Sequence, residues 1–265
     1  MNANTQVENS MGANLTALYT IARREMTRIL RIWTQTLIPP AITMTLYFMI
    51  FGKLIGSRIQ DMDGVSYMAF IVPGLVMMSV IQNAYGNISS SFFGAKFGRH
   101  IEELLVSPMP NWVILLGYVA GAVLRGLMVG AIVLVIALFF TKLEVPHPII
   151  TFVTVILGAT IFALAGFINA IYAKKFDDIA IIPTFILTPL TYLGGVFYSV
   201  KILPEWAQSM THLNPVFYIV NAFRYGLLGI HDMPLWQSFS LMGFFIVALG
   251  AFSLYLLNRG TGLRS

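Results

Sequence analysis

The sequence predicts an all-α membrane protein with six transmembrane helices, an N-terminal amphipathic interface helix and a re-entrant helical hairpin before the last span. Hydrophobic residues make up 57% of the 265 residues and charged residues only 10%, whereas about a quarter of a soluble domain is charged. Mean hydropathy is +0.79. Apolar runs recur that are each near the roughly 20 residues needed to cross about 30 Å of hydrocarbon. The six predicted spans are Leu37–Ile55, Met68–Phe92, Trp112–Phe140, Ile149–Tyr172, Ile179–Val200 and Leu235–Leu257.

The chain divides into a tail, one interface helix and one membrane domain. We expect a polar N-terminal tail at 1–14, the amphipathic helix at 15–35, the six-span domain at 36–258 and a C-terminal tail at 259–265. Within the domain, a short helix between spans occupies about 94–110, and the re-entrant segment occupies about 201–232. The first fourteen residues are polar and lack the basic-then-apolar order of a cleaved secretory signal.

Lys and Arg predict the orientation, because cytoplasmic segments carry an excess of both residues. With the N-terminus inside, the cytoplasmic segments hold ten of them and the outer segments five, leaving Arg125 inside the third span. Both termini are therefore predicted to be cytoplasmic. The overall excess of 16 Lys and Arg over 11 Asp and Glu fits a basic face against anionic membrane lipid, and no nucleic-acid partner is expected because the basic residues are dispersed.

The amphipathic helix has an apolar side and a basic side at 100° per residue. Two interpretations remain open: the helix is a topology anchor in the headgroup layer, or it also docks a partner. A turn is expected at Pro39-Pro40, before the first span. The apolar side comprises Leu15, Leu18, Tyr19, Ala22, Met26, Ile29, Leu30 and Trp33, and the basic side Arg23, Arg24, Thr27, Arg28 and Arg31.

The cytoplasmic stretch "GAKFGRHIEELLVSPMP", from Gly94 to Pro110, is predicted to contain a short helix. Ile101, Leu104 and Leu105 are spaced for one helix face, and Ser107 before a proline should end the helix. Such a rigid charged helix can dock in a groove of a soluble partner, whereas the alternative is an ordinary solvated loop.

The third span has glycines four apart, at Gly117/Gly121 and Gly126/Gly130, which lets other helices approach closely. It also contains Arg125, the only charge well inside a predicted span. An intramembrane charge indicates a pathway or a buried polar contact. However, this span is longer than the hydrocarbon layer, so the alternative is that Arg125 reaches the cytoplasmic interface.

Several catalytic and coupling classes lack their residues in this sequence. There is no G-x-x-x-x-G-K-[ST] loop for nucleotide binding, no cysteine, and no Asp or Glu deep within a predicted span. The four histidines fall in loops without metal-ligand spacing, so no metal site is expected. The polar patch Ser89-Ser90-Ser91 has no buried histidine to activate a nucleophile. We therefore expect no enzyme activity and no cofactor on this chain.

The stretch "LPEWAQSMTHLNPVFYIVNAFRYG", before the last span, falls on the outer side in this topology. Pro204 and Pro215 mark two helix starts and divide it into Glu205–Thr211 and Val216–Leu227, both too short to cross a bilayer. One interpretation is an aromatic anchor at the interface; the other, which we favour, is a re-entrant pair of helices in the outer leaflet.

The order of these features identifies a resemblance. A basic amphipathic helix and six spans are accompanied by "IVPGL" at Ile71–Leu75, "EELLVSP" at Glu102–Pro108, and "VFYSVKILPEW" followed by "LNPVFYIVNAFRYG". Over nearly its whole length the chain resembles the transmembrane subunit of bacterial ATP-binding-cassette (ABC) transporters of the type-2 class, which includes exporters of drugs, polysaccharides and nodulation factors. Where the family usually has Gly-Thr before the first Glu, this chain has His100-Ile101.

The resemblance implies a multi-pass permease subunit of the bacterial inner membrane. It would export a lipophilic, drug-like, glycan or lipid substrate, powered by two copies of a separate ATPase that binds ATP and Mg, and would pair with a second permease subunit as a homodimer. The residues implied to couple to the ATPase are Arg24, Arg28, Arg99, His100, Glu102, Glu103 and Leu104. The implied outer gate comprises Pro204, Trp206, Asn214, Pro215, Phe217 and Arg224, and Arg125 is a candidate for the substrate path.

Two other functional classes remain open on the residues alone. An ion-gradient-driven carrier could bind its ion through backbone carbonyls or through Asn83, Asn87 and Asn169. A non-transporting membrane scaffold could share the same topology. Transport in ATP-depleted vesicles would identify the first, and copurification with partners without substrate-dependent ATPase would identify the second.

Overall fold

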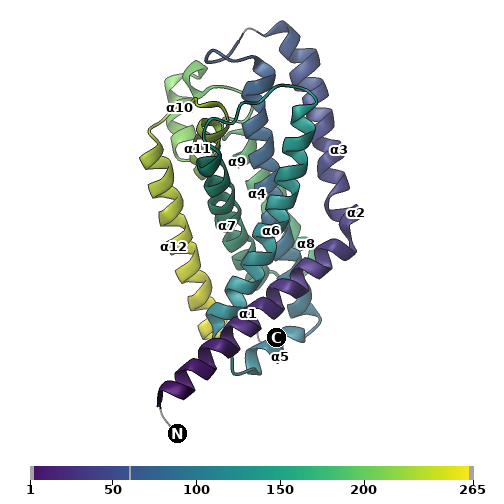
Figure 1. The fold of residues 1–265 in the computed structure, drawn as a ribbon, viewed down its shortest axis with the longest axis vertical. Coiled ribbons are helices and arrows are strands. Elements are labelled where there is room, and N and C mark those ends of the chain that lie inside the picture. Colours follow the sequence, from purple (N-terminus) through teal and green to yellow (C-terminus); the bar gives the residue numbers. More distant parts are fainter. Residues whose placement is uncertain (1–2, 60, 263–265) are drawn as a thin grey trace.

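The computed structural model describes residues 3–59 and 61–262, and over these residues the protein is a bundle of α-helices. In Figure 1 the long helices run roughly along one axis, and helix α1 lies across one end of the bundle. Both chain termini lie at the end that carries α1 and the short helix α5, while the short helices α10 and α11 lie toward the opposite end (Figure 1). We call these the α1 end and the α10 end.

Helices follow one another with short connections. Their bounds are α1 Ala3–Arg31, α2 Trp33–Thr36, α3 Ile38–Tyr47, η1 Phe48–Ile55, η2 Gly56–Arg58, α4 Tyr67–Phe97, α5 His100–Val106, α6 Asn111–Leu138, α7 Pro148–Tyr172, α8 Phe176–Ile182, η3 Pro183–Leu187, α9 Thr188–Tyr192, η4 Val200–Ile202, α10 Glu205–His212, α11 Pro215–Leu228 and α12 Leu235–Arg259. The interface helix thus begins at Ala3, within the segment expected to be a polar tail.

Five helical stretches among the described residues are long and apolar enough to cross a membrane: Trp33–Ile55, Tyr67–Phe97, Asn111–Leu138, Pro148–Tyr172 and Leu235–Arg259. The expected span Ile179–Val200 corresponds instead to the consecutive helices α8, η3 and α9, of 7, 5 and 5 residues. Its predicted end at Val200 is wrong, because the helix stops at Tyr192. Gly195 then adopts a φ of +72°, a left-handed conformation that suits glycine and turns the chain.

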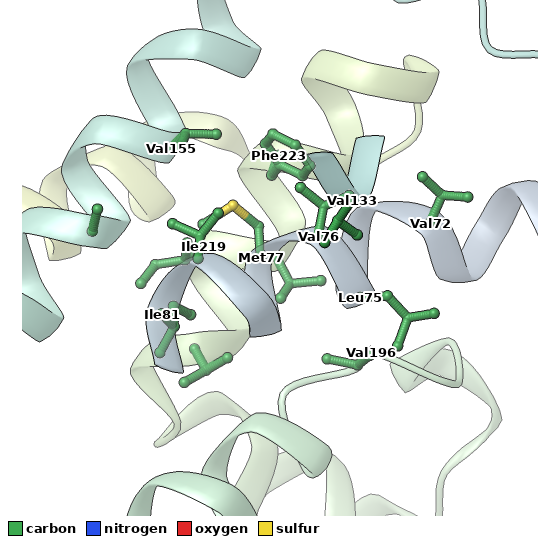
Figure 2. Close-up of a cluster of buried hydrophobic side chains, with 14 of the residues drawn as sticks. Val72, Leu75, Val76, Met77, Ile81, Val133, Val155, Val196, Ile219 and Phe223 are labelled. Atoms are coloured by element: carbon green, nitrogen blue, oxygen red, sulfur yellow. The ribbon is translucent and has the colours of Figure 1, made fainter. Parts of the chain in front are cut away.

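Helix α4 lies at the centre of the bundle, since 83% of the residues in its apolar 18-residue stretch are buried. Its side chains meet those of α6, α7 and α11 in one apolar cluster, in which Val76 and Met77 lie close to Ile219 and Phe223 (Figure 2). By contrast, only 17% of the residues in the apolar 18-residue stretch of Trp33–Ile55 are buried, and only 22% of those in the stretch of α12. The stretch containing α3 and helix α12 lie at opposite sides of the bundle in Figure 1. Their exposed apolar surfaces are what a lipid environment requires.

Prolines mark several helix boundaries where the sequence predicts them. Pro39 and Pro40 lie in the first turn of α3, Pro204 is the residue before α10, and Pro215 is the first residue of α11. Helix α5 ends at Val106 because the next residue, which precedes a proline, is extended.

The two glycine pairs of α6 face different helices. A Cβ atom on Gly117 would lie 2.6 Å from the Ile21 side chain, and one on Gly121 would lie 2.5 Å from Glu25 Cβ. A Cβ atom on Gly130 would lie 2.7 Å from the side chain of Val80 in α4. The glycines therefore allow α1 to pack on one side of α6 and α4 on another, as the spacing predicted.

Candidate functional site

Helix α1 has three faces rather than the two that its sequence pattern predicts. Ile21, Glu25 and Ile29 are 4%, 2% and 0% exposed and form a seam against the bundle. Apolar residues beside this seam, such as Tyr19 and Leu30, remain exposed at 64% and 51%. The seam lies at the border between the predicted apolar and basic sides. Helix α1 therefore packs on α6 and still presents one apolar and one basic stripe to its surroundings.

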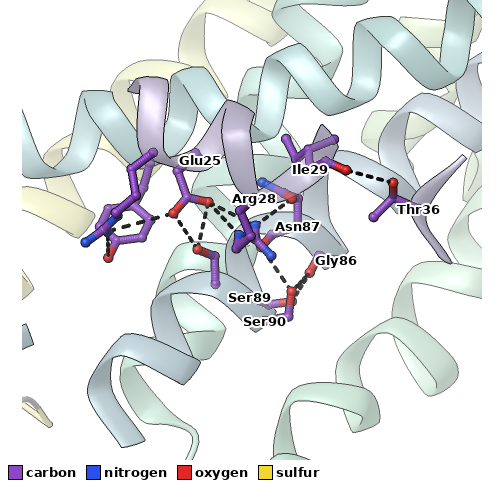
Figure 3. A network of polar contacts seen from close by, with 11 residues as sticks. Glu25, Arg28, Ile29, Thr36, Gly86, Asn87, Ser89 and Ser90 are labelled. Carbon is purple, nitrogen blue, oxygen red and sulfur yellow. Dashed lines mark hydrogen bonds and ion pairs between the residues drawn. The ribbon is translucent and has the colours of Figure 1, made fainter. Parts of the chain in front are cut away.

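Glu25 is the centre of a polar network between α1 and α4. Its carboxylate accepts hydrogen bonds from Ser91 Oγ at 2.7 Å and from Arg28 Nη2 at 2.9 Å. Arg28 Nη2 also donates to Asn87 Oδ1 at 2.7 Å. Figure 3 shows Glu25 and Arg28 reaching from α1 toward Asn87 on α4. A buried carboxylate with charged and hydroxyl donors is well stabilised, so these bonds fix the position of α1 on the bundle.

The network continues to α6 through Arg24. Arg24 Nη2 donates to the Tyr118 hydroxyl at 2.6 Å, and it lies 3.8 Å from Glu25 Oε1. The Arg24 guanidinium also lies 5.4 Å from the centre of the Tyr118 ring, within cation–π range. Helix α1 is thus attached to α4 and to α6 by separate polar contacts.

A groove of ≈ 700 Å³ opens beside this network at the α1 end. Its lining combines the basic side of α1 with the end of α4 and the first residue of α5. The guanidinium group of arginine is planar and donates strong hydrogen bonds to carboxylates and phosphates. The groove is therefore suited to an acidic or phosphorylated surface. Its basic lining residues are Arg23, Arg24, Arg28, Arg31 and His100.

Helix α5 projects from this end between α4 and α6. Arg99, which links α4 to α5, has a φ of +59°, an unusual conformation for a residue other than glycine. Ile101 is buried, whereas Glu102 and Glu103 are exposed and Leu104 is half-buried. Helix α5 is therefore anchored by its apolar side and presents its two carboxylates outward. The predicted coupling residues Arg24, Arg28, His100, Glu102 and Glu103 are gathered at one end of the bundle.

Arg125 lies near the middle of α6 and is not part of this network. Arg125 Nη2 donates to Asn83 Oδ1 of α4 at 3.1 Å. Beside it is a smaller cavity of ≈ 260 Å³, lined by residues of α2, α3, α4 and α6. Arg125 thus makes a part-buried polar contact between α6 and α4.

At the α10 end, Asp232 connects α11 to η4. Its carboxylate accepts a hydrogen bond from Arg224 Nη1 at 3.2 Å and forms an ion pair with Lys201 at 3.4 Å. Lys201 also lies 3.4 Å from Asp63. Partial burial works to lower the pKa of Lys201, but attraction to Asp232 and Asp63 outweighs it and raises that pKa above its usual value. Arg224 also donates to the Gly195 carbonyl and lies 4.1 Å from the centre of the Phe70 ring.

The predicted gate residues occupy two different environments. Pro204 is exposed and Trp206 is 71% exposed, whereas Asn214 and Phe217 are 4% and 1% exposed. Asn214 Nδ2 donates to the Leu190 carbonyl at 2.7 Å, and Asn214 Oδ1 accepts from the Val216 N–H at the start of α11. Helix α11 is therefore packed into the bundle in this conformation, while α10 covers the surface above it.

Several residues of these sites were missed from the sequence. Glu25 lies among four arginines on α1, and its i,i+3 spacing to Arg28 was a usable signal. Tyr118 and Asp232 could not be found, and the polar patch that includes Ser91 did not indicate Glu25, because the partners come from distant parts of the chain or from a loop.

Residues 16–228 match the ABC-2 type transporter family. The chain belongs to this family. It is 58% identical over 249 residues to the inner membrane transport permease YadH of Escherichia coli K12, covering 94% of this chain and 97% of that protein. It is also similar to Nodulation protein J of Neorhizobium galegae, at 25% identity over 71% of this chain and 72% of that protein. A Sinorhizobium fredii Nodulation protein J is 26% identical, covering 67% of this chain and 68% of that protein.

Family membership assigns the chain its role. It is the membrane-spanning permease subunit of an ABC transporter, and ATP hydrolysis belongs to a separate ABC ATPase subunit with which it works. This decides against the gradient-driven carrier and the non-transporting scaffold. The groove and α5 at the α1 end of the permease are consequently candidates for the contact with that ATPase.

Proposed function

We propose that two copies of this permease form a substrate path and that two ATPase subunits, which bind ATP and Mg, act on the α1 end. The observation that carries this proposal is the combination of an anchored α5, its exposed Glu102 and Glu103, and the adjoining basic groove. We infer export of a lipophilic, drug-like, glycan or lipid substrate, supported by the similarity to Nodulation protein J.

The proposed topology has six spans in the bacterial inner membrane with both termini in the cytoplasm. Five helical stretches have the length and composition to cross the membrane. The consecutive helices α8, η3 and α9, from Phe176 to Tyr192, would form the remaining span, which is the fifth along the chain. An even number of crossings fits the two termini at one end of the bundle in Figure 1. The excess of basic residues at that end supports its cytoplasmic location, as does the similarity to an inner membrane permease.

Coupling would run from α5 into α4 and α6, the helices that flank it. Arg99, His100, Glu102, Glu103 and Leu104 lie on or beside α5, while Arg24 and Arg28 join α1 to the same two helices. A displacement of α5 by the closing ATPase would therefore act on α4 and α6 together with α1, because the polar network resists their separation.

Charge reversal on α5 tests this coupling. We expect Glu102→Lys together with Glu103→Lys to abolish substrate-stimulated ATPase activity or assembly with the ATPase, since both carboxylates are exposed and unimportant for packing. A matched control is Glu144→Lys with Glu205→Lys, which reverses two exposed carboxylates of the α10 end, one in the loop after α6 and one at the start of α10. Normal coupling and export in the α5 variant would contradict the proposal.

Helices α10 and α11 would form a re-entrant outer gate. Their 8 and 14 residues span about 12 and 21 Å at 1.5 Å per residue, less than the hydrocarbon thickness. Asn214 and Phe217 are buried at their junction in this conformation. Cysteines placed there should become accessible from outside when ATP is trapped on the ATPase, and identical labelling in both states would exclude the gate.

A further inference from the structure

We propose that the cavity beside Arg125 binds the anionic headgroup of an amphiphile whose apolar tail remains in the lipid. The cavity has a volume of ≈ 260 Å³, below the usual range for whole drug-sized ligands, about 300–1,000 Å³. Its size therefore suits a headgroup better than a complete amphiphile. Its polar lining residues are Gln35 of α2, Thr43 of α3, Ser79, Gln82 and Asn83 of α4, and Arg125 of α6.

Arg125 is held inside the bundle and does not extend toward an interface. It lies near the midpoint of α6, Asn111–Leu138, and its guanidinium donates to Asn83, which is near the midpoint of α4, Tyr67–Phe97. A charged side chain at such depth is costly unless it is paired or faces water or a polar ligand. The question is therefore what balances its charge.

Within the described part of the chain, no carboxylate lies within ion-pair distance of Arg125. The charged side chain that acts on it is Arg28, which carries the same sign. Arg224 provides the contrast, because it is even more deeply buried but has Asp232, the Gly195 carbonyl and the Phe70 ring as partners. The charge of Arg224 is thus balanced within the chain and that of Arg125 is not.

The guanidinium also has unused donors. Its hydrogen bond to Asn83 uses Nη2, and its Nε is buried without a hydrogen-bond partner among the described residues. Phosphate and carboxylate oxygens accept two parallel hydrogen bonds from such a fork. The amides of Gln35 and Gln82 supply further donors at the same cavity.

The surroundings of the cavity indicate how the ligand enters. Gln35 and Thr43 are exposed, and they lie on the helical stretch Trp33–Ile55. Only 17% of the residues in the apolar 18-residue part of this stretch are buried. Next to the cavity, Ile38, Ile42 and Leu46 of the same stretch are 38%, 57% and 52% exposed. A molecule with its headgroup at Arg125 could therefore lay an apolar tail along α3 in the lipid, which a free anion cannot do.

Binding of dodecyl phosphate to the purified permease in an uncharged detergent tests the proposal. We expect dodecyl phosphate to bind, and dodecylphosphocholine and inorganic phosphate to bind at least tenfold more weakly. Arg125→Gln should weaken dodecyl phosphate binding at least tenfold. Thr43→Phe, at an exposed position of the cavity rim, should do the same by closing the entrance. Arg58→Gln, which removes an exposed arginine outside the cavity, should change the affinity less than twofold.

Equal affinity in the wild type and in Thr43→Phe would overturn the proposal, even if Arg125→Gln fails to fold. Equally tight binding of inorganic phosphate would overturn it as well. Native mass spectrometry of the permease from phosphatidylglycerol nanodiscs then separates the two sources. Retained phosphatidylglycerol that dodecyl phosphate displaces identifies a membrane lipid, whereas a lipid-free permease that binds dodecyl phosphate identifies a transported amphiphile. Neither measurement needs the ATPase, so its result is independent of the proposed coupling.

Discussion

Replacing Glu25 by Gln should release α1 from the bundle, because this carboxylate receives donors from both α1 and α4. The substitution keeps the shape of the side chain but removes its charge, which weakens the bonds from Ser91 and Arg28 and leaves Arg28 with Asn87 alone. Removing one partner of a charged hydrogen bond costs about 1.5–3 kcal/mol. Arg28 is 32% exposed, so water compensates in part, and we expect about 2 kcal/mol.

A loss of about 2 kcal/mol corresponds to a roughly thirty-fold larger undocked population, since about 1.4 kcal/mol is tenfold. The chain has no cysteine, so a single Ile21→Cys reports docking directly. Ile21 is 4% exposed and faces Gly117 in the docked helix. When docking and undocking are fast, the rate of maleimide labelling follows the undocked fraction. The rate should therefore rise roughly thirty-fold in the Glu25→Gln background.

Arg23→Gln is the matched control, because it changes the charge of an exposed residue on the same helix whose side chain makes no hydrogen bond to the described part of the bundle. Its labelling rate should stay within about twofold of the parent, as for most exposed substitutions. If Glu25→Gln also stays within twofold, the polar network does not hold α1 in place, and the reasoning from its geometry is refuted.

Three further predictions concern packing. In the same labelling assay Gly121→Ala should increase the rate, since its Cβ would lie 2.5 Å from Glu25 Cβ, whereas Gly243→Ala, with open space around it, should not. Gly74→Ala should lower the free energy of unfolding by roughly 1–3 kcal/mol in thermal melts, because its Cβ would lie 2.6 Å from Val196 Cα; an unchanged melting temperature would contradict this contact. Arg224→Gln should lower the free energy of unfolding by about 3 kcal/mol, the cost of breaking a buried ion pair, and a loss no larger than that of Arg58→Gln would show that the Asp232 contact is unimportant.

The membrane fold could be predicted from the sequence because apolar runs of bilayer length have few alternatives. The end of the fifth predicted span could not, since hydropathy continues past Tyr192 while the chain turns at Gly194 and Gly195. That turn is stabilised by Arg224, which donates to the Gly195 carbonyl from 29 residues away. A pairing of this kind is invisible to a pattern read along one helix.

The candidate site was predicted in its elements but not in its connections. The glycine pairs of α6 indicated close packing without saying that Gly117 and Gly121 receive α1. The sequence placed Arg28 on a basic side and did not connect it to Asn87, 59 residues away. The sequence offers Arg125 either a polar contact or a place near the interface, and it does not indicate Asn83, 42 residues away, as the hydrogen-bond partner.

Cysteine protection at the two ends of the bundle tests most directly whether the ATPase acts on the α1 end. The permease with a single Glu102→Cys or a single Glu205→Cys, both at exposed positions, is labelled with and without its ATPase subunit. An ATPase bound at the α1 end should protect Glu102→Cys on α5 and leave Glu205→Cys on α10 fully reactive. Full reactivity of Glu102→Cys in the assembled transporter, or protection of Glu205→Cys in its place, would contradict it.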